Sequence, residues 1–297
     1  MEPIIKVENF TFYYPDSQVP ALDGINLTVQ EGEFLGLTGP TGAGKTTLAL
    51  ALNGIIPNFQ GGRMGGRVMV AGLDTAKTPC ARLAGVIGSV FQDPEAQLVA
   101  EVVEDELAFG LENLAVPRDE MERRIATALE MTGIAGLRHR NLRELSGGQK
   151  QKVAIAATVA LRPRVLVLDE PTSELDPRGT LEIMALLQRL NREYGITILL
   201  IEQKISVLAP RVPRLVCLNK GRIVADAGPR QILAQEKLTA DLGLEVPPVT
   251  ALFRMLRRAG VYHGDLPLDI DEGRRELGRL LGSKVPALAP LYLEAQK

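Results

Sequence analysis

One glycine-rich segment constrains the fold of this chain more than any other feature. Residues 39–46, GPTGAGKT, match the pattern G-x-x-x-x-G-K-[ST], follow an apolar run at 34–37 and precede a helix candidate at 48–52. Glycines in such a loop let backbone N–H groups turn toward phosphate oxygens, and the positive end of the helix dipole favours an anion. An ordinary glycine-rich turn would not need this context. The sequence therefore predicts a phosphate-binding loop between a strand and a helix.

Residues in this loop and at the end of a later strand could carry out phosphoryl transfer. Lys45 would contact the β- and γ-phosphates, and the Thr46 hydroxyl would bind Mg²⁺. The apolar run 165–168 leads to Asp169, which would hold Mg²⁺ directly or through water, and to Glu170, which would polarise the attacking water. Taken alone, such a run could be a strand with a solvated tip. Beside the phosphate loop, it predicts catalysis by positioning and charge neutralisation.

Composition indicates a globular protein and excludes several function classes. The chain has 297 residues, of which 45% are hydrophobic and 24% charged, and this is ample for a sizeable core. The net charge of −2 predicts no general attraction to nucleic acid or anionic lipid. Cys80 and Cys217 form no CxxC pair, which fits a reduced cytosolic protein and argues against a disulfide framework or a zinc site.

Apolar runs in the sequence are too short for a membrane helix, which needs about 20 residues. The longest, at 153–161 and 196–201, fall well short of that length. The N-terminal MEPIIKVENF also lacks the basic start and long apolar stretch of a signal peptide. If this protein works at a membrane, we therefore expect another chain to span it.

The apolar pattern predicts an α/β core. Continuous apolar runs at 165–168 and 196–201 suit strands buried on both faces, as in a parallel sheet, and residues 177–193 between them favour a helix. The other core segments are expected to be strands at 4–12, 25–38 and 85–92 and a flexible hairpin or loop at 61–72.

Two later regions are expected to be mainly helical. Residues 98–161 are mostly helical in character, and Asp119 followed by Glu122 resembles a helix cap. The apolar side chains that follow at near-helical spacing are Met121, Ile125, Ala128, Leu129 and Thr132. After about Arg230 the pattern changes to short helical stretches, which we interpret as a small C-terminal appendage. These stretches are split by Pro247, Pro248, Pro267, Pro286 and Pro290.

A third motif is LSGGQ at 145–149, the signature motif. Ser146 and the two glycines would start a helix and provide a second anion-binding helix end, although in isolation they could simply be a cap. Together with the phosphate loop and the acidic strand end, the motif strongly resembles the ATP-binding cassette (ABC) family. The resemblance implies a P-loop NTPase fold of the α/β class, with a RecA-like core, a helical subdomain and a small C-terminal appendage. It also implies ATP and Mg²⁺ as cofactors.

The resemblance assigns roles to individual residues. The signature motif would cap the γ-phosphate bound by a partner cassette, so that two cassettes close head to tail over two ATP molecules. Gln92 matches the glutamine that senses Mg²⁺ and the attacking water, and Tyr14, or its neighbour Tyr13, matches the aromatic residue that stacks on adenine. Residues 173–176 match the loop that crosses the dimer interface and also suit a helix cap. The implied nucleotide contacts are Tyr14, Gly39, Pro40, Thr41, Gly42, Ala43, Gly44, Lys45, Thr46, Thr47, Ser146, Gly147, Gly148 and Gln149.

One position departs from the family pattern. Where such proteins usually carry a histidine that contacts the γ-phosphate, this chain has Gln203, and neither His139 nor His263 fits the pattern. Glutamine can hydrogen-bond phosphate but cannot become a cation near neutral pH. We therefore expect this chain's own site, with Glu170, Gln92 and Gln203 as catalytic residues, to hydrolyse ATP weakly. Its intact signature motif favours a heterodimer with a second, histidine-bearing cassette, and a homodimer is the alternative.

A narrower resemblance comes from residues 90–98, VFQDPEAQL, and 104–114, EDELAFGLENL. They closely resemble the ATPase subunits of energy-coupling factor (ECF) transporters, a group that includes cobalt-importer ATPases and imports vitamins or transition-metal ions. The tail, at 242–248 and 266–268, resembles the segment through which such ATPases contact each other. The implied domains are an ABC ATP-binding domain at 1–235, with a helical subdomain at about 95–161, and a helical dimerisation segment at 236–297.

The partners implied by this resemblance are a second ABC ATPase, a transmembrane coupling protein and a small membrane protein that captures the substrate. No nucleic-acid partner is expected. The chain would lie at the cytoplasmic face of the cell membrane as a peripheral protein, and the helical segment near 92–115 would pass the motion of the cassettes to the membrane protein. That segment could instead be an amphipathic surface helix whose apolar side chains pack inward.

Other functions share the same nucleotide motifs. The chain could be the ATPase of a conventional ABC importer or exporter, or a regulatory cassette with little turnover. A non-transport ABC protein of DNA repair or translation fits less well, because no long heptad run separates Lys45 from Ser146 and only one cassette is present. The near-neutral charge also gives no nucleic-acid footprint.

Overall fold

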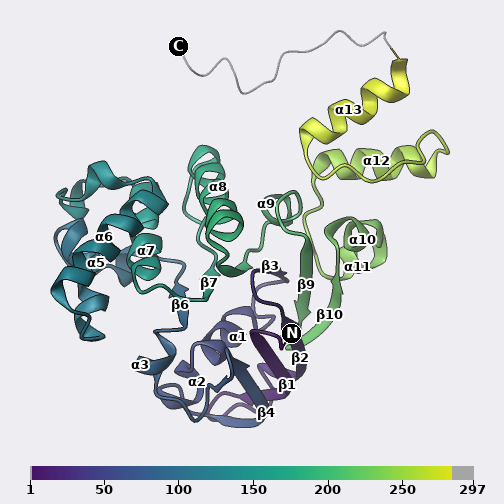
Figure 1. Cartoon of the computed structure of the whole chain (residues 1–297). Helices are drawn as coiled ribbons and strands as arrows, with labels where there is room; N and C mark the ends of the chain where they lie inside the picture. The colour runs from purple at the N-terminus through teal and green to yellow at the C-terminus, as the bar shows by residue number, and fades with distance from the viewer. Residues whose placement is uncertain (1, 283–297) are drawn as a thin grey trace.

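The computed structural model describes residues 2–282, and its centre is a six-stranded sheet (Figure 1). The strand order is β10-β9-β3-β8-β7-β6, and only the β9–β10 pair is antiparallel. The α/β class expected from the sequence is confirmed. The strands are β3 (Phe34–Thr38), β6 (Ile87–Val90), β7 (Val165–Asp169), β8 (Thr197–Ile201), β9 (Arg214–Asn219) and β10 (Arg222–Ala227).

The three central strands of this sheet end level with one another. Every residue of β3, β7 and β8 is buried, which confirms both continuous apolar runs as strands of a parallel sheet. Ile201 pairs with Leu37 on one side and with Asp169 on the other. Because parallel strands present their carboxyl ends at the same edge, the loops after β3, β7 and β8 meet there.

A second, antiparallel sheet covers part of the core, in the order β2-β1-β4-β5. Residues 61–72 were expected to form a flexible hairpin or loop, but most of them form β4, which pairs with β1 along its length. Gly65 and Gly66 interrupt the alternation of apolar and polar side chains that would predict a strand. Gly66 lies so close to the backbone of Asn9 that a side chain would not fit. The strands are β1 (Ile5–Tyr13), β2 (Leu22–Val29), β4 (Arg63–Val70) and β5 (Leu73–Asp74).

Helices cover both faces of the six-stranded sheet. On one face, α1 packs between the two sheets in an apolar core that includes Leu48 and Leu52. On the other face, α8 packs through Ile183, Leu187 and Leu190, which confirms the helix expected at 177–193. These helices are α1 (Lys45–Leu52), α2 (Ile55–Asn58), α3 (Cys80–Leu83), α8 (Pro177–Tyr194) and α9 (Ile205–Leu208).

A separate group of helices lies to one side of the core, left of α8 in Figure 1, and has its own apolar cluster. The expected cap at Asp119 is wrong, because the residue before the helix is Pro117 and Asp119 lies in the first turn, where the helix dipole favours its charge. Glu122 instead binds Arg138, at 2.6 Å. The elements are α4 (Pro94–Gln97), α5 (Val103–Asn113), α6 (Arg118–Thr132), η1 (Ala135–Leu137), η2 (Leu142–Glu144) and α7 (Gly147–Ala160).

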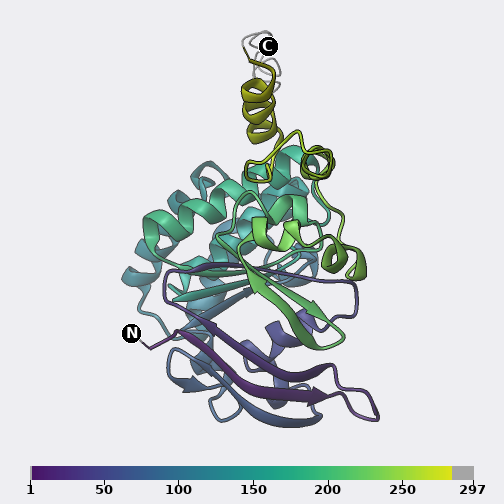
Figure 2. The ribbon, with the colours of Figure 1, turned by 90° about the vertical axis from the view of Figure 1, so that its right-hand side faces the viewer.

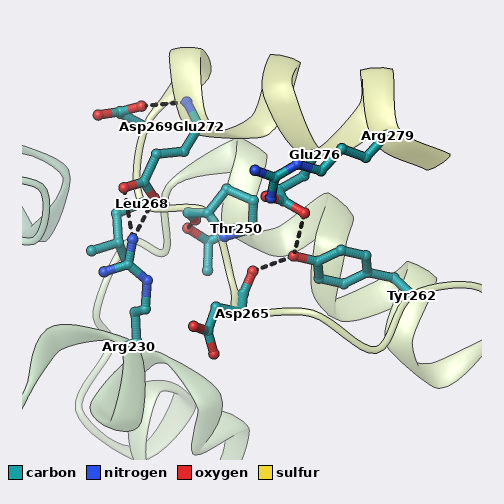
Figure 3. Close-up of polar contacts among 10 residues, drawn as sticks. Arg230, Thr250, Tyr262, Asp265, Leu268, Asp269, Glu272, Glu276 and Arg279 are labelled. Atoms are coloured by element: carbon teal, nitrogen blue, oxygen red, sulfur yellow. Dashed lines mark hydrogen bonds and ion pairs between the residues drawn. The ribbon is translucent and has the colours of Figure 1, made fainter. Parts of the chain in front are cut away.

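Short helices come after β10: the first, at 229–234, packs against β9 and β10, and the last two extend away from the two sheets (Figure 2). Arg230 binds Glu272 at 2.6 Å and so joins the first of these helices to the last (Figure 3). The Thr250 hydroxyl also donates to the carbonyl of Pro267, in the loop before the last helix, at 2.6 Å. Pro286 and Pro290, like the rest of 283–297, lie outside the described residues. The helices are α10 (Pro229–Ala234), α11 (Glu236–Asp241), α12 (Pro248–Arg258) and α13 (Ile270–Leu281). Within residues 2–282, no helix combines the length and the hydropathy that crossing a bilayer requires.

Replacing Leu200 by alanine should destabilise the fold strongly. Leu200 is fully buried in β8, between β3 and β7, so the variant loses apolar contacts and leaves a cavity that costs about 2–5 kcal/mol. Urea unfolding measures the loss. The control is Val224→Ala on β10, where the side chain is 43% exposed, and it should change the free energy of unfolding by no more than about 0.5 kcal/mol. Equal losses in the two variants would contradict this account of the core.

Candidate active site

The loop between β3 and α1 has a backbone that only glycine can adopt at two positions. Gly39 has φ +150°, and a Cβ there would lie 2.1 Å from the Leu218 carbonyl oxygen. Gly44 has φ +103°, and its Cβ would lie 2.5 Å from the Ala21 carbonyl oxygen. The loop is therefore pressed against the ends of neighbouring segments, and α1 begins directly after it at Lys45.

Lys45 is held inside this loop. Its side chain is buried, and Nζ donates to the carbonyl oxygens of Gly39 at 2.9 Å and Pro40 at 3.1 Å. Burial lowers the pKa of Lys45, while the nearby carboxylates of Glu170 and Asp169 oppose that shift. The cation is thus placed between the loop and the acidic strand end, where it can neutralise a phosphate charge.

Thr46 and Asp169, both expected to bind Mg²⁺, lie in contact. Burial raises the pKa of the Asp169 carboxyl at the end of β7, and the neighbouring Thr46 side chain opposes that shift. Among the described residues, no cluster of three or more His, Cys, Asp and Glu side chains could hold a metal by itself. One hydroxyl and one carboxylate suit Mg²⁺, which usually keeps several waters and substrate phosphates as ligands. The donor set therefore fits the ion, with the nucleotide completing its shell.

Glu170 and Gln203 meet across the carboxyl ends of β7 and β8. The Gln203 Nε2 atom donates to Glu170 Oε1 at 2.8 Å, and the Glu170 backbone N–H donates to the Ile201 carbonyl at 2.9 Å. Glu170 has φ +50°, a left-handed conformation that costs free energy for a residue with a side chain. Its carboxylate is thus directed by hydrogen bonds and by an unusual backbone.

A cavity of about 370 Å³ opens at this edge of the sheet. Gln92, Glu170 and Gln203, the residues expected to be catalytic, all line it. Of the nucleotide contacts expected in the phosphate loop, Gly39, Pro40 and Ala43 do not line it, and the first two hold Lys45 instead. The complete lining is Tyr14, Ala21, Thr41, Gly42, Gly44, Lys45, Thr46, Thr47, Gln92, Glu170 and Gln203.

The two adjacent tyrosines point to different environments. Tyr14 lines the cavity, and its hydroxyl lies 3.0 Å from the Thr47 hydroxyl. The Arg63 guanidinium lies 4.7 Å from the centre of the Tyr13 ring. Tyr14 is therefore the better candidate for stacking on adenine, and this role stays a prediction.

The signature motif forms a helix end, as the sequence predicted. Ser146 precedes α7, its backbone N–H donates to Gln149 Oε1 at 2.9 Å, and the Gln149 backbone N–H donates to the Ser146 hydroxyl at 3.4 Å. The lining of the cavity includes neither these residues nor Gly147 and Gly148. Within residues 2–282, the signature motif is thus separate from this chain's own phosphate loop.

The cap expected before α8 is present. The Asp176 carboxylate accepts from the Gly179 backbone N–H at 2.6 Å, and Pro177 is the first helical residue. This cap fixes the end of the loop 173–176, which the resemblance places at a dimer interface. The interface role stays a prediction.

Sequence reasoning missed Glu202 and Thr172. Glu202 is only 3% exposed, and its Oε1 atom accepts from the Thr172 hydroxyl at 2.6 Å and from the Thr172 backbone N–H at 3.2 Å. Burial raises the pKa of Glu202 to about 7, against the lowering effect of the Thr172 bonds. The only signal in the sequence is a glutamate directly after a fully apolar strand, and the polar residues beyond it suggest exposure.

A groove of about 330 Å³ lies between the core and the side group of helices. Phe91 and Phe109 line it, and they are 39% and 50% exposed. Phe91 adjoins Gln92, which lines the cavity at the edge of the sheet. Gln97 fixes this junction, because its side chain accepts from the Phe91 N–H at 3.0 Å and donates to the Ser89 carbonyl at 3.3 Å.

Comparison with known proteins agrees with this geometry. Residues 22–173 match the family model described as ABC transporter. A Pyrococcus abyssi protein, named among ABC transporter ATP-binding proteins, is 42% identical over 87% of this chain and 92% of its own length. The solved structure of CbiO1 from Clostridium perfringens, described as part of the ABC transporter complex CbiONQ, has a TM-score of 0.73 and 34% identity over 85% of this chain and 99% of that one. An ABC transporter cassette in its ADP conformation has a TM-score of 0.70 and 27% identity, over 81% and 98%.

The buried Glu202 carboxyl should make stability depend on pH. Because burial raises its pKa from 4.5 to about 7, the folded protein binds an extra proton between these values. The free energy of unfolding should therefore fall by about 3 kcal/mol as the pH rises through this window, if Glu202 acts alone. Urea unfolding at several pH values measures the slope, which should be much smaller in Glu202→Gln. Glu193→Gln, at an exposed position of α8, should keep the wild-type slope. An unchanged slope in Glu202→Gln would contradict the assignment.

Proposed function

Because this chain belongs to the ABC transporter ATP-binding family, whose members are the ATPases of ABC transporters, we propose that it energises an importer of the energy-coupling factor (ECF) type. The proposed cargo is a vitamin or a transition-metal ion, and the chain would act at the cytoplasmic face of the membrane. The observation that carries this assignment is the segment 90–114, whose sequence resembles ECF ATPases and whose Phe91 and Phe109 line the exposed groove. The likeness to CbiO1 supports it.

The proposed reaction is attack of water on the γ-phosphorus, which breaks the bond to the β-phosphate and releases ADP and phosphate. Glu170 orients this water and accepts its proton, while Lys45 neutralises charge on the β- and γ-phosphates. Mg²⁺, held by Thr46 and Asp169 with Gln92 nearby, would neutralise further phosphate charge. The backbone N–H groups of the loop that begins at Gly39 bind phosphate oxygens. All of these groups meet at one edge of the sheet.

Gln203 makes slow turnover the expected property of this site. Its amide donates to Glu170 Oε1 at 2.8 Å, so part of the carboxylate's capacity to accept a proton from water is already engaged. An amide also cannot add a positive charge near the γ-phosphate, as a protonated histidine can. We therefore propose a heterodimer with a histidine-bearing cassette. The signature motif of this chain would complete the partner's site.

The proposed contact for the transmembrane coupling protein is the groove between the core and the side helices. Exposed aromatic side chains in a concave site suit an inserted helix of a partner. The 236–297 segment is proposed to pair the two ATPases, and its α12 exposes Leu252 and Met255, at 42% and 65%. The substrate-capture protein would reach this chain only through the coupling protein.

Two other assignments share the site. A conventional ABC transporter would use the same cavity, and co-purification with a substrate-capture membrane protein would distinguish the ECF type from it. A regulatory cassette with little turnover is favoured by the Gln203–Glu170 hydrogen bond, and transport with a disabled Glu170 would reveal it.

Replacing Gln203 by histidine should raise ATP hydrolysis. The imidazole can carry a positive charge and contact the γ-phosphate, so we expect the rate of this site to rise by about tenfold in the assembled transporter, with the partner cassette's catalytic carboxylate replaced by its amide if the complex is a heterodimer. Steady-state phosphate release measures it. Gln30→His, on an exposed turn after β2, is the matched control and should leave the rate unchanged. An unchanged or lower rate in Gln203→His would count against a site slowed by Gln203.

If hydrolysis at this site is essential for transport, replacing Glu170 by glutamine should abolish uptake while ATP still binds. The amide cannot accept a proton from the attacking water, and we expect uptake to fall by about a hundredfold or more. Transport of labelled substrate into vesicles that contain the complete transporter measures this, beside nucleotide binding. Glu193→Gln at an exposed position is the control. Uptake at the wild-type rate in Glu170→Gln would show that this site is regulatory.

A further inference from the structure

A buried carboxylate joins the two loops that carry Glu170 and Gln203. Glu202 comes directly after β8, is 3% exposed and does not line the cavity where those two side chains meet. Instead its Oε1 atom accepts two hydrogen bonds from Thr172, one from the hydroxyl at 2.6 Å and one from the backbone N–H at 3.2 Å. Thr172 is itself only 2% exposed. The contact is therefore an internal one between two strand-end loops.

These bonds close a ring around the reacting carboxylate. Glu170 lies two residues before Thr172, and Gln203 lies one residue after Glu202. The Gln203 amide donates to Glu170 at 2.8 Å, so the two loops are joined on both sides of Pro171. The backbone N–H of Glu202 also donates to the Leu37 carbonyl at 3.1 Å, which ties the ring to β3 before the phosphate loop.

The hydrogen bonds of this ring surround a residue with an unfavourable backbone conformation. Glu170 has φ +50°, and a residue with a side chain stays in this region only when its surroundings hold it there. A buried carboxylate is costly unless it is hydrogen-bonded, and an apolar residue would fill the same space at lower cost. The two hydrogen bonds from Thr172 to Glu202, here called the clamp, instead fix both the hydroxyl and the backbone of Thr172. Thr172 is the residue that leads into the 173–176 loop.

We propose that Glu202 is a positioning residue: by clamping Thr172 it sets the direction of the Glu170 carboxylate toward the attacking water and fixes the start of the 173–176 loop. This inference rests on the proposed ATPase function. Glu202 does not line the cavity, so the clamp would act on the chemical step and leave nucleotide binding to the loop around Lys45.

The test compares variants that keep the clamp with variants that remove it. Thr172→Val deletes the hydroxyl at nearly constant volume, and Glu202→Leu deletes the acceptor. Thr172→Ser keeps the hydroxyl, and Glu202→Gln keeps an oxygen that accepts. Thr132→Val is the matched control, since it removes another buried hydroxyl bond, 2.7 Å to the Ala128 carbonyl, in α6. Steady-state ATP hydrolysis is measured in the assembled transporter, with the partner cassette's catalytic carboxylate replaced by its amide if the complex is a heterodimer.

A positioning role predicts a specific pattern of kinetic constants. Thr172→Val and Glu202→Leu should each lower kcat by about tenfold, with KM for ATP changed by less than about twofold. Thr172→Ser, Glu202→Gln and Thr132→Val should stay within about threefold of the wild-type kcat. Because both deletions break the same contact, the double variant should be no slower than the worse single variant.

The outcomes separate this inference from the function on which it rests. If the wild-type chain in its complex hydrolyses no ATP, the proposed function fails. If it hydrolyses ATP while folded Thr172→Val keeps the wild-type kcat, the clamp has no positioning role. Effects that multiply in the double variant, or a rise in KM that accounts for the whole loss, would also overturn the inference. Thermal unfolding and nucleotide binding identify a variant that failed to fold, and Thr172→Ser and Glu202→Gln then decide: a tenfold loss of kcat in either folded variant overturns the clamp.

Discussion

Parallel pairing of β3, β8 and β7 is the constraint on which the site depends. The pairing aligns Leu37, Ile201 and Asp169, so the three strands stop at the same level. The groups at the three strand ends then have to meet: a phosphate-binding loop, a glutamate–glutamine pair and an acidic pair. The strands are fully buried, and therefore the apolar contacts that stabilise the sheet also fix the distances between the polar groups at its edge. The same three strands therefore stabilise the fold and place the residues of the site.

At that edge, polar groups are held in place by one another and by the backbone. Lys45 is bound by carbonyls of its own loop, and Thr46 lies beside Asp169. Glu170 and Gln203 face each other directly. Burial shifts the pKa of Lys45 down and that of Asp169 up, whereas the Glu170–Gln203 contact lies nearer the solvent. A bound nucleotide thus meets groups that are already oriented.

The sequence predicted the parts of this arrangement that leave a periodic or motif signal. Continuous apolar runs indicated β7 and β8, and the glycine-rich loop indicated the phosphate site. β4 escaped prediction because Gly65 and Gly66 contribute no side chains to an alternating pattern. The Asp119 cap was wrong because Pro117 already precedes the helix, and spacing alone does not show which residue comes first. Glu202 escaped because its burial depends on Thr172, which lies 30 positions earlier in the chain. A contact between residues that lie far apart in the chain produces no local pattern in the sequence.

Phe91 and Gln92 share one peptide bond yet face two different cavities. Their Cα atoms are separated by about 3.8 Å, and a planar peptide neither stretches nor bends appreciably. The backbone of Phe91 therefore cannot move far without moving the backbone of Gln92. A backbone displacement at the groove that Phe91 lines would thus also displace the backbone at the cavity that Gln92 lines.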